Sequence, residues 1–237
     1  MRTLLVSAGL ALASGALLGA GSDPSPPAAD ASPTPLKQIG RVRTSVCSTI
    51  VVHANSAIDD ALANDAAVRS LAVQLATANI ADATDLAKRK VINAIENAVS
   101  KLRETALAGE GEVRRLRQLA ADSPEPRKTE LRQFADAIGG ALYRQRMIAI
   151  DTQRLIVIQQ GRESVQNQNA MYAGTGTTAD ATGRTPDPVI EQTATAKQAD
   201  YDQAFKTVAA DIVERSKLIL SDEGIAADHG LGATTGC

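Results

Sequence analysis

Aromatic residues are almost missing from this chain of 237 residues. Phe, Tyr and Trp make up 2% of it, with no tryptophan and only two phenylalanines, Phe134 and Phe205. Large aromatic side chains usually fill globular cores and line ligand pockets. Their scarcity, in a chain rich in alanine, predicts helices packed along thin aliphatic seams and argues against a deep cavity.

The chain also lacks an excess of charge of one sign, and histidine and cysteine are rare. It has 25 basic and 27 acidic residues, a formal net charge of −2, two histidines and two cysteines. Nucleic-acid binding requires a strong positive field. We therefore expect no nucleic-acid partner.

The first 22 residues have the pattern of a signal peptide. Arg2 precedes an apolar stretch at residues 4–18, and small residues at 20–22 provide a cleavage site before Asp23. The apolar stretch is short for a membrane span. These features predict export to the periplasm or the outside of the cell. The alternative is an uncleaved segment, which would then be the chain's contact with a membrane.

The remaining chain divides by composition. Residues 23–36 are rich in Pro and Ala and predict a disordered tether. Residues 37–220 predict one helical bundle domain, interrupted by a Gly- and Thr-rich loop at 171–187 that we interpret as a mobile crossover. Residues 221–237 predict a flexible tail.

Apolar residues alternate at spacings of three and four along the second expected helix, which ends near Asp122. This period of 3.5 residues is typical of a helix that packs lengthwise against another helix. Glycine in a helix costs about 1 kcal/mol, so Gly109 and Gly111 predict a kink or a close helix approach. The seam consists of Ile92, Ile95, Val99, Leu102, Ala106, Gly109, Val113, Leu116 and Ala120.

Three further helices are expected at residues 42–79, 127–170 and 188–220. Asn64-Asp65 either breaks the first of these or lies within one continuous helix. Ser123, followed by two prolines, marks a turn and a cap for the third helix. The fold class predicted is all-α, an elongated antiparallel bundle of three to four long helices with coiled-coil-like packing.

Charge is spread unevenly over these helices. Residues 86–118 are rich in Lys and Arg, whereas the last helix and the tail are acidic. We interpret this difference as ion pairing between neighbouring helices of the bundle. The alternative is a basic strip that contacts an acidic envelope polymer or lipid headgroups.

Cysteine and histidine offer few sites. In an oxidising compartment Cys47 and Cys237 could form one disulfide that closes a long loop. Alternatively, Cys237 bridges two chains, or Cys47 is buried and Cys237 is free. His53 lies six residues after Cys47, which is not the spacing of two metal ligands on one helix face, and His229 falls in the expected tail. We predict no metal and no cofactor.

One polar series stands out on the third helix. Gln145, Thr152, Gln159 and Gln166 recur every seven residues between apolar neighbours. They form either the polar margin of the seam or a buried polar ladder that sets helix register. The ladder predicts that leucine at Gln145 and Gln159 stabilises the protein and loosens its unique pairing.

No catalytic set is visible in the sequence. The carboxylate pairs Asp59-Asp60 and Asp222-Glu223 are adjacent residues, which point about 100° apart on a helix, and both are expected on the solvated surface. The Gly-rich pieces lack the strand and helix that flank a phosphate loop. The chain is not expected to be an enzyme.

The segment Val42-Arg43-Thr44-Ser45-Val46-Cys47, followed by Ala63-Asn64-Asp65, resembles a set of exported, all-helical bacterial proteins to which no activity is assigned. The resemblance implies an exported helical protein with a cysteine in its first helix. Our first functional hypothesis is a scaffold or adaptor that contacts another protein or a second copy of itself. The alternatives are a bundle that binds a small ligand or metal in the envelope and, third, an enzyme.

Overall fold

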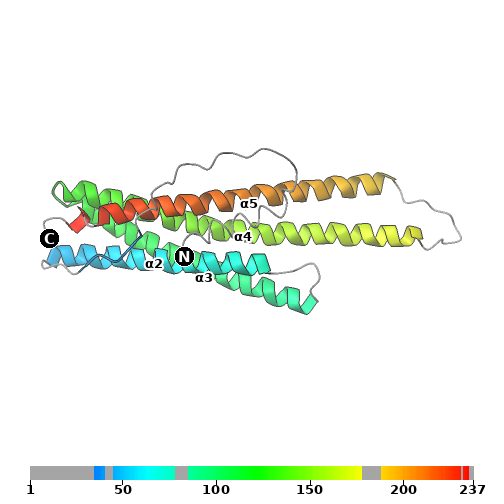
Figure 1. The fold of residues 1–237 in the computed structure, drawn as a ribbon, viewed down its shortest axis with the longest axis horizontal. Coiled ribbons are helices and arrows are strands. Elements are labelled where there is room, and N and C mark those ends of the chain that lie inside the picture. The colour runs from blue at the N-terminus through cyan, green and yellow to red at the C-terminus, as the bar shows by residue number, and fades with distance from the viewer. Residues whose placement is uncertain (1–34, 41–44, 78–84, 178–187, 231, 235–237) are drawn as a thin grey trace, which may run out of the picture. The chain divides into compact units, whose positions relative to one another are not determined.

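The structure, a computed structural model, describes residues 35–40, 45–77, 85–177, 188–230 and 232–234. These residues form a bundle of four long helices and contain no strand, which confirms the predicted all-α class. The elements are α2 (Ser45–Thr77), α3 (Asp85–Ala121), α4 (Arg127–Thr177), α5 (Pro188–Gly230) and the short 3₁₀ helix η1 (Gly232–Thr234) (Figure 1).

The chain divides into two compact units where a single domain at 37–220 was expected. The first unit combines Met1–Ile150 with Val213–Cys237, and the second is Asp151–Ile212. The division follows from helix length, because α4 has 51 residues and α5 has 43, whereas α2 has 33 and α3 has 37. The extra residues of α4 and α5 form a helical hairpin of their own.

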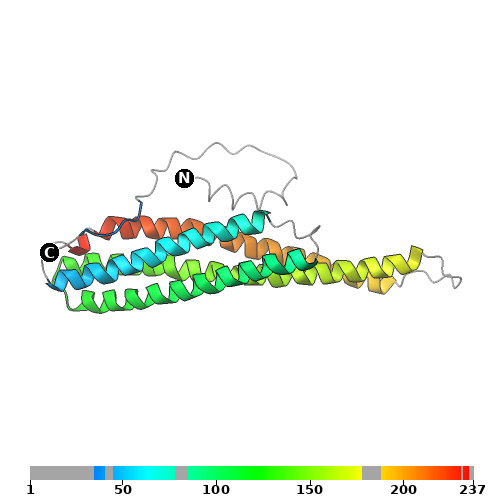
Figure 2. The same ribbon diagram turned by 90° about the horizontal axis from the view of Figure 1, so that it is seen from below.

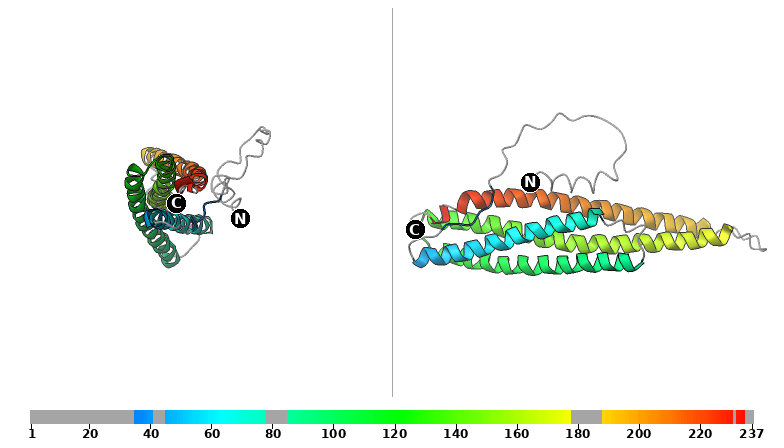
Figure 3. Two further views of the ribbon diagram at one scale, coloured as in Figure 1. Left: turned by 90° about the vertical axis from the view of Figure 1, so that its left-hand side faces the viewer. Right: turned by 60° about the horizontal axis from the view of Figure 1, so that its bottom comes forward.

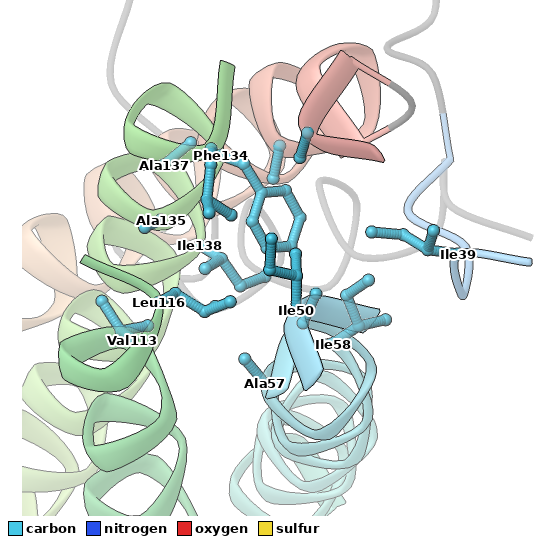
Figure 4. Close-up of a cluster of buried hydrophobic side chains, with 14 of the residues drawn as sticks. Ile39, Ile50, Ala57, Ile58, Val113, Leu116, Phe134, Ala135, Ala137 and Ile138 are labelled. Atoms are coloured by element: carbon cyan, nitrogen blue, oxygen red, sulfur yellow. The ribbon is translucent and has the colours of Figure 1, made fainter. Parts of the chain in front are cut away.

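In the first unit, α2, α3, the first part of α4 and the last part of α5 surround a shared core (Figures 2 and 3). Phe134 of α4 is fully buried among aliphatic side chains of α2 and α3 (Figure 4). The seam of α3 lies inside as predicted, and only its first member, Ile92, is partly exposed. Its buried members are Ile95, Val99, Leu102, Ala106, Gly109, Val113, Leu116 and Ala120.

Helix α2 runs without a break through Asn64 and Asp65, which settles the alternative that the sequence left open. Both residues are buried, at 1% and 7% exposure. The Asp65 carboxylate receives a hydrogen bond from Gln145 of α4 and lies 3.7 Å from Arg69. A buried Asp65 in the middle of the helix is therefore compatible with continuity, because Gln145 of α4 supplies its partner.

The turn between α3 and α4 uses its polar residues differently from the prediction. Ser123 was expected to cap the following helix, but its hydroxyl donates to the carbonyl of Leu119 at 2.8 Å and so closes the end of α3. Glu125, two residues before the start of α4 at Arg127, caps this helix instead, because its carboxylate accepts hydrogen bonds from the hydroxyl and the backbone N–H of Thr129. The acceptor at the helix start is thus a carboxylate, which the helix dipole favours.

The expected flexible tail at 221–237 is wrong for most of its length. Helix α5 continues ten residues beyond the expected end at Leu220, to Gly230, and η1 follows and packs against α2. Ala226 and Ala233 are fully buried. The Nδ1 atom of His229 lies 2.8 Å from Glu130 of α4. The composition of this segment had suggested disorder, but its small residues allow it to pack closely against neighbouring helices.

Two other boundaries also differ. Helix α4 extends to Thr177, so residues 171–177 of the expected loop are helical, while 178–187 lie outside the described residues. The expected tether at 23–36 is wrong at its end, because Leu36 is buried at 4% exposure. Residues 1–34, including the signal peptide prediction at 1–22, lie outside the described residues. None of the described helices has an apolar stretch long enough to cross a bilayer.

Candidate functional site

Polar side chains meet inside the first unit where Gln145 of α4 faces α2. The Gln145 Nε2 atom donates to the backbone carbonyl of Ala61 at 2.9 Å and to Asp65 Oδ1 at 3.2 Å. Gln145 itself is fully buried. Because an unsatisfied buried polar group costs about 1–3 kcal/mol, these bonds favour the one register of α2 against α4 that allows them.

The four members of the predicted polar series do not share this environment. Thr152 is 1% exposed and so lies inside, like Gln145. Gln159 is half-buried and bonds within its own helix, where it accepts from Arg162 at 3.3 Å. Gln166 is exposed. The series is therefore interior over its first two members and a polar margin over its last two.

His53 joins α2 to α3. Its Nδ1 atom lies 2.6 Å from Glu112 Oε2, while Glu112 Oε1 accepts a hydrogen bond from Arg115 at 3.0 Å. Asp60 of α2 is close enough to this contact for its charge to interact with that of Glu112. Desolvation by burial raises the pKa of Asp60 above its ordinary value of 3.8, and the negative charges of Glu112 and Asp59 raise it further. At this contact between α2 and α3, the negative charges of Asp60 and Glu112 therefore act on each other.

A second polar contact joins α4 to α5. Arg144 Nη1 lies 3.2 Å from Asp222 Oδ2. A Cβ atom on Gly140 would lie 2.6 Å from the same oxygen, so glycine leaves the room that this carboxylate needs. Burial raises the pKa of Asp222, whereas the Arg144 guanidinium acts in the opposite direction. The expectation that Asp222 and Glu223 are solvated is wrong, because Asp222 is partly buried and Glu223 is 1% exposed.

The contact of Arg144 with Asp222 has a counterpart in the second unit, where Arg162 Nε lies 2.8 Å from Asp202 Oδ1. In both cases a basic residue of α4 pairs with an acidic residue of α5. These two pairs agree with the interpretation that the uneven charge serves contacts between helices. The sequence alone missed the specific pairs because it gives no register between α4 and α5.

The hairpin of the second unit is held together at Gly161. A Cβ atom on Gly161 would lie 2.5 Å from the Tyr201 ring, so the ring packs directly over the α4 backbone. Arg162 lies over the Phe205 ring at 5.5 Å, a cation–π distance. Most other apolar side chains of the hairpin are incompletely buried. Among its larger apolar residues whose burial the structure describes, only Leu155 and Val165 are buried, whereas six are partly buried: Ile156, Ile158, Tyr201, Phe205, Val208 and Ile212.

An additional polar contact, which the sequence did not predict, involves the segment before α2. The side-chain amide of Asn55 receives a hydrogen bond from the backbone N–H of Ile39 at 2.7 Å and donates one to the Ile39 carbonyl at 3.0 Å. Gln38 Nε2 donates to Asp59 Oδ1 at 2.7 Å. The sequence signal for this contact was the pair of apolar residues Leu36 and Ile39 after a proline-rich stretch. Two apolar residues are too few to predict a contact.

Cys47 is 2% exposed and is disulfide-bonded. Its predicted partner Cys237 lies outside the described residues, so the pairing of these two residues stays a prediction. Over the part of the chain that the structure describes, no group of three or more His, Cys, Asp and Glu side chains is placed to hold a metal ion. Comparison of the chain with protein-family models, with curated proteins and with solved structures finds no match.

Proposed function

We propose that this protein is an exported scaffold or adaptor that contacts a partner protein, or a second copy of itself, through the helical hairpin at Asp151–Ile212. The observation that supports this proposal is the incomplete burial of the hairpin's apolar residues. Two helices cannot cover each other's apolar faces completely, and association with a further helix would bury more of this surface.

Val157 provides a sharp test, because it is 66% exposed on the hairpin and has a matched control in the first unit. Val52 on α2 is also a valine in a helix and is 63% exposed. We expect Val157→Asp to weaken association and Val52→Asp to leave it unchanged. Size-exclusion chromatography with light scattering on the mature chain, with and without reductant, measures the assembly.

A photoreactive residue at position 157, with position 52 as control, identifies the partner. Cross-linked products from the cell envelope that contain position 157 would support the proposal and separate self-association from a different protein. Equal association and equal cross-linking of both variants would contradict it. The export component is tested separately, because the intact mass of the secreted protein shows whether the chain begins at Asp23.

The alternative function, binding of a small ligand or metal within the bundle, has its own measurement. Native mass spectrometry of the protein purified from the envelope detects a retained ligand as added mass. A stoichiometric added mass, together with association that does not depend on Val157, would favour the alternative over the scaffold.

A further inference from the structure

The residues that precede α2, residues 35–40, lie along the first unit as a segment that is not helical. They have the sequence Pro35-Leu36-Lys37-Gln38-Ile39-Gly40. Leu36 and Ile39 are buried, at 4% and 8% exposure, and the other four residues are exposed. Ile39 approaches the core from the side of this segment (Figure 4). We call residues 35–40 the N-terminal strap.

The strap is bound through its main chain as well as its side chains. One side chain, Asn55, satisfies both the N–H and the C=O of Ile39. Such a pair of hydrogen bonds recognises the backbone of a non-helical strand and is independent of the side chain that the strand carries at that position. A second polar contact, from Gln38 to Asp59, lies one turn further along α2.

Apolar contacts provide the other half of the recognition. Leu36 and Ile39 belong to the same buried cluster as Val51, Ala54 and Ile58 of α2. Ile39 also reaches the end of α5, since a Cβ atom on Gly230 would lie 3.8 Å from Ile39 Cδ1. Leu36 and Ile39, the second and fifth residues of the strap, are therefore anchored, while the two residues between them are exposed.

We infer that the face of α2 around Asn55 is a binding site for an extended peptide segment of another protein, and that the strap is its built-in occupant. The segment that fits has two apolar side chains three residues apart, as Leu36 and Ile39 are, and a free backbone N–H and C=O at the second of them. This combination of backbone hydrogen bonds with spaced apolar pockets is a general mode of peptide recognition. The site is separate from the hairpin and does not depend on the proposed scaffold function.

Because the strap is covalently attached to α2, it competes with any external peptide for the site around Asn55. Four residues separate Gly40 from the first residue of α2, and a short tether gives an effective concentration of about millimolar order. An external segment therefore binds poorly while the strap is in place. Weakening the strap, without changing the site, should expose the binding activity.

The test uses the full mature chain with Leu36→Asp and Ile39→Asp, which remove the two anchors of the strap. The probe is a fluorescent peptide with the sequence of residues 35–40 and blocked ends. We expect fluorescence anisotropy to show at least about tenfold tighter binding to this variant than to the unchanged protein. Adding Asn55→Ala to the variant should weaken binding about tenfold, which corresponds to about 1.4 kcal/mol.

Matched peptides control for non-specific adsorption. A probe with the Lys37→Asp change alters an exposed position and should bind like the original, whereas a probe with Ile39→Asp should not bind. Folding of the double variant is checked by circular dichroism. Absence of binding to the folded variant at millimolar peptide, or binding that ignores both Asn55 and Ile39, would overturn the inference.

If the double variant does not fold, a second variant of the chain tests the inference. Here a protease site replaces residues 41–44, and cleavage after folding leaves the strap in place without its covalent connection. The labelled peptide should then exchange with the cleaved strap during prolonged incubation and should do so faster in an Asn55→Ala background. A cleaved protein that retains its own strap against millimolar peptide would show that residues 35–40 are simply part of the fold.

Discussion

A Cβ atom added to Gly109 of α3 would lie 2.8 Å from Leu142 Cδ1 of α4, so these two helices approach each other closely at a position where only hydrogen fits. The same atom would lie 3.1 Å from the Asp60 Cβ atom of α2. The predicted close approach at this glycine is therefore confirmed, and three helices of the first unit share it. Gly111, two residues later, has no such neighbour and meets only the end of Arg114.

Alanine at these two glycines should act in opposite directions. Gly109→Ala should destabilise the protein by about 1–3 kcal/mol, because the added methyl group overpacks a core contact. Gly111→Ala should stabilise it by about 0.5–1 kcal/mol, because alanine is the better helix residue and nothing obstructs it. Urea denaturation measures both free energies of unfolding, and equal effects of the two changes would contradict the close approach.

Leucine at Gln145 should destabilise the protein, contrary to the expectation from the sequence. Gln145→Leu removes hydrogen bonds from the buried Ala61 carbonyl and the buried Asp65 carboxylate, with an expected loss of about 1–3 kcal/mol. Gln159→Leu lies at a half-buried position and should change stability by no more than about 0.5 kcal/mol. Thermal and urea unfolding compare the two, and stabilisation by both would restore the hypothesis of a polar ladder that sets helix register at a cost in stability.

Removing the charge of Asp60 should stabilise the protein in a pH-dependent way. Because the pKa of Asp60 is raised in the folded state, the folded protein binds this proton more strongly than the unfolded chain does. The native residue therefore costs stability as the pH rises from 3.8 through its folded pKa. At pH values above this range, Asp60→Asn should have a higher urea midpoint than the unchanged protein. Below pH 3.8 the two proteins should have similar midpoints.

Glu104→Gln is the control for the loss of one negative charge, since Glu104 is an exposed residue of α3. It should shift the urea midpoint little across the same pH series. A gain from Asp60→Asn that is independent of pH would show that the effect does not arise from the titration of this carboxyl group.

The hairpin should depend on the contact between Gly161 and Tyr201. Gly161→Ala places a methyl group 2.5 Å from the Tyr201 ring and should force the ring away. Hydrogen exchange should then become faster within residues 151–212, while protection in α2 should stay unchanged. Adding Tyr201→Ala should remove the clash, and a double-mutant cycle should give a coupling of about 0.5–3 kcal/mol. Additive effects would contradict direct packing.

The amino-acid sequence by itself determined the helical class, the seam of α3 and the helix starts to within a few residues. It could do so because the spacing of apolar residues along one helix is a local property that the 3.6-residue turn converts directly into a face. The predicted seam from Ile95 to Ala120 is buried at every member for this reason. The turn after Ala121 was equally readable from its two prolines.

Only the tertiary structure decided which polar residues lie inside and where packing ends. Gln145 and Gln166 look alike in the sequence, yet the first is buried against α2 and the second is exposed. The Gly-rich end of α5 and Leu36 were expected outside the bundle, but both are packed against it. These outcomes depend on the register between distant helices, and side-chain pairing across helices fixes that register only after the chain has folded.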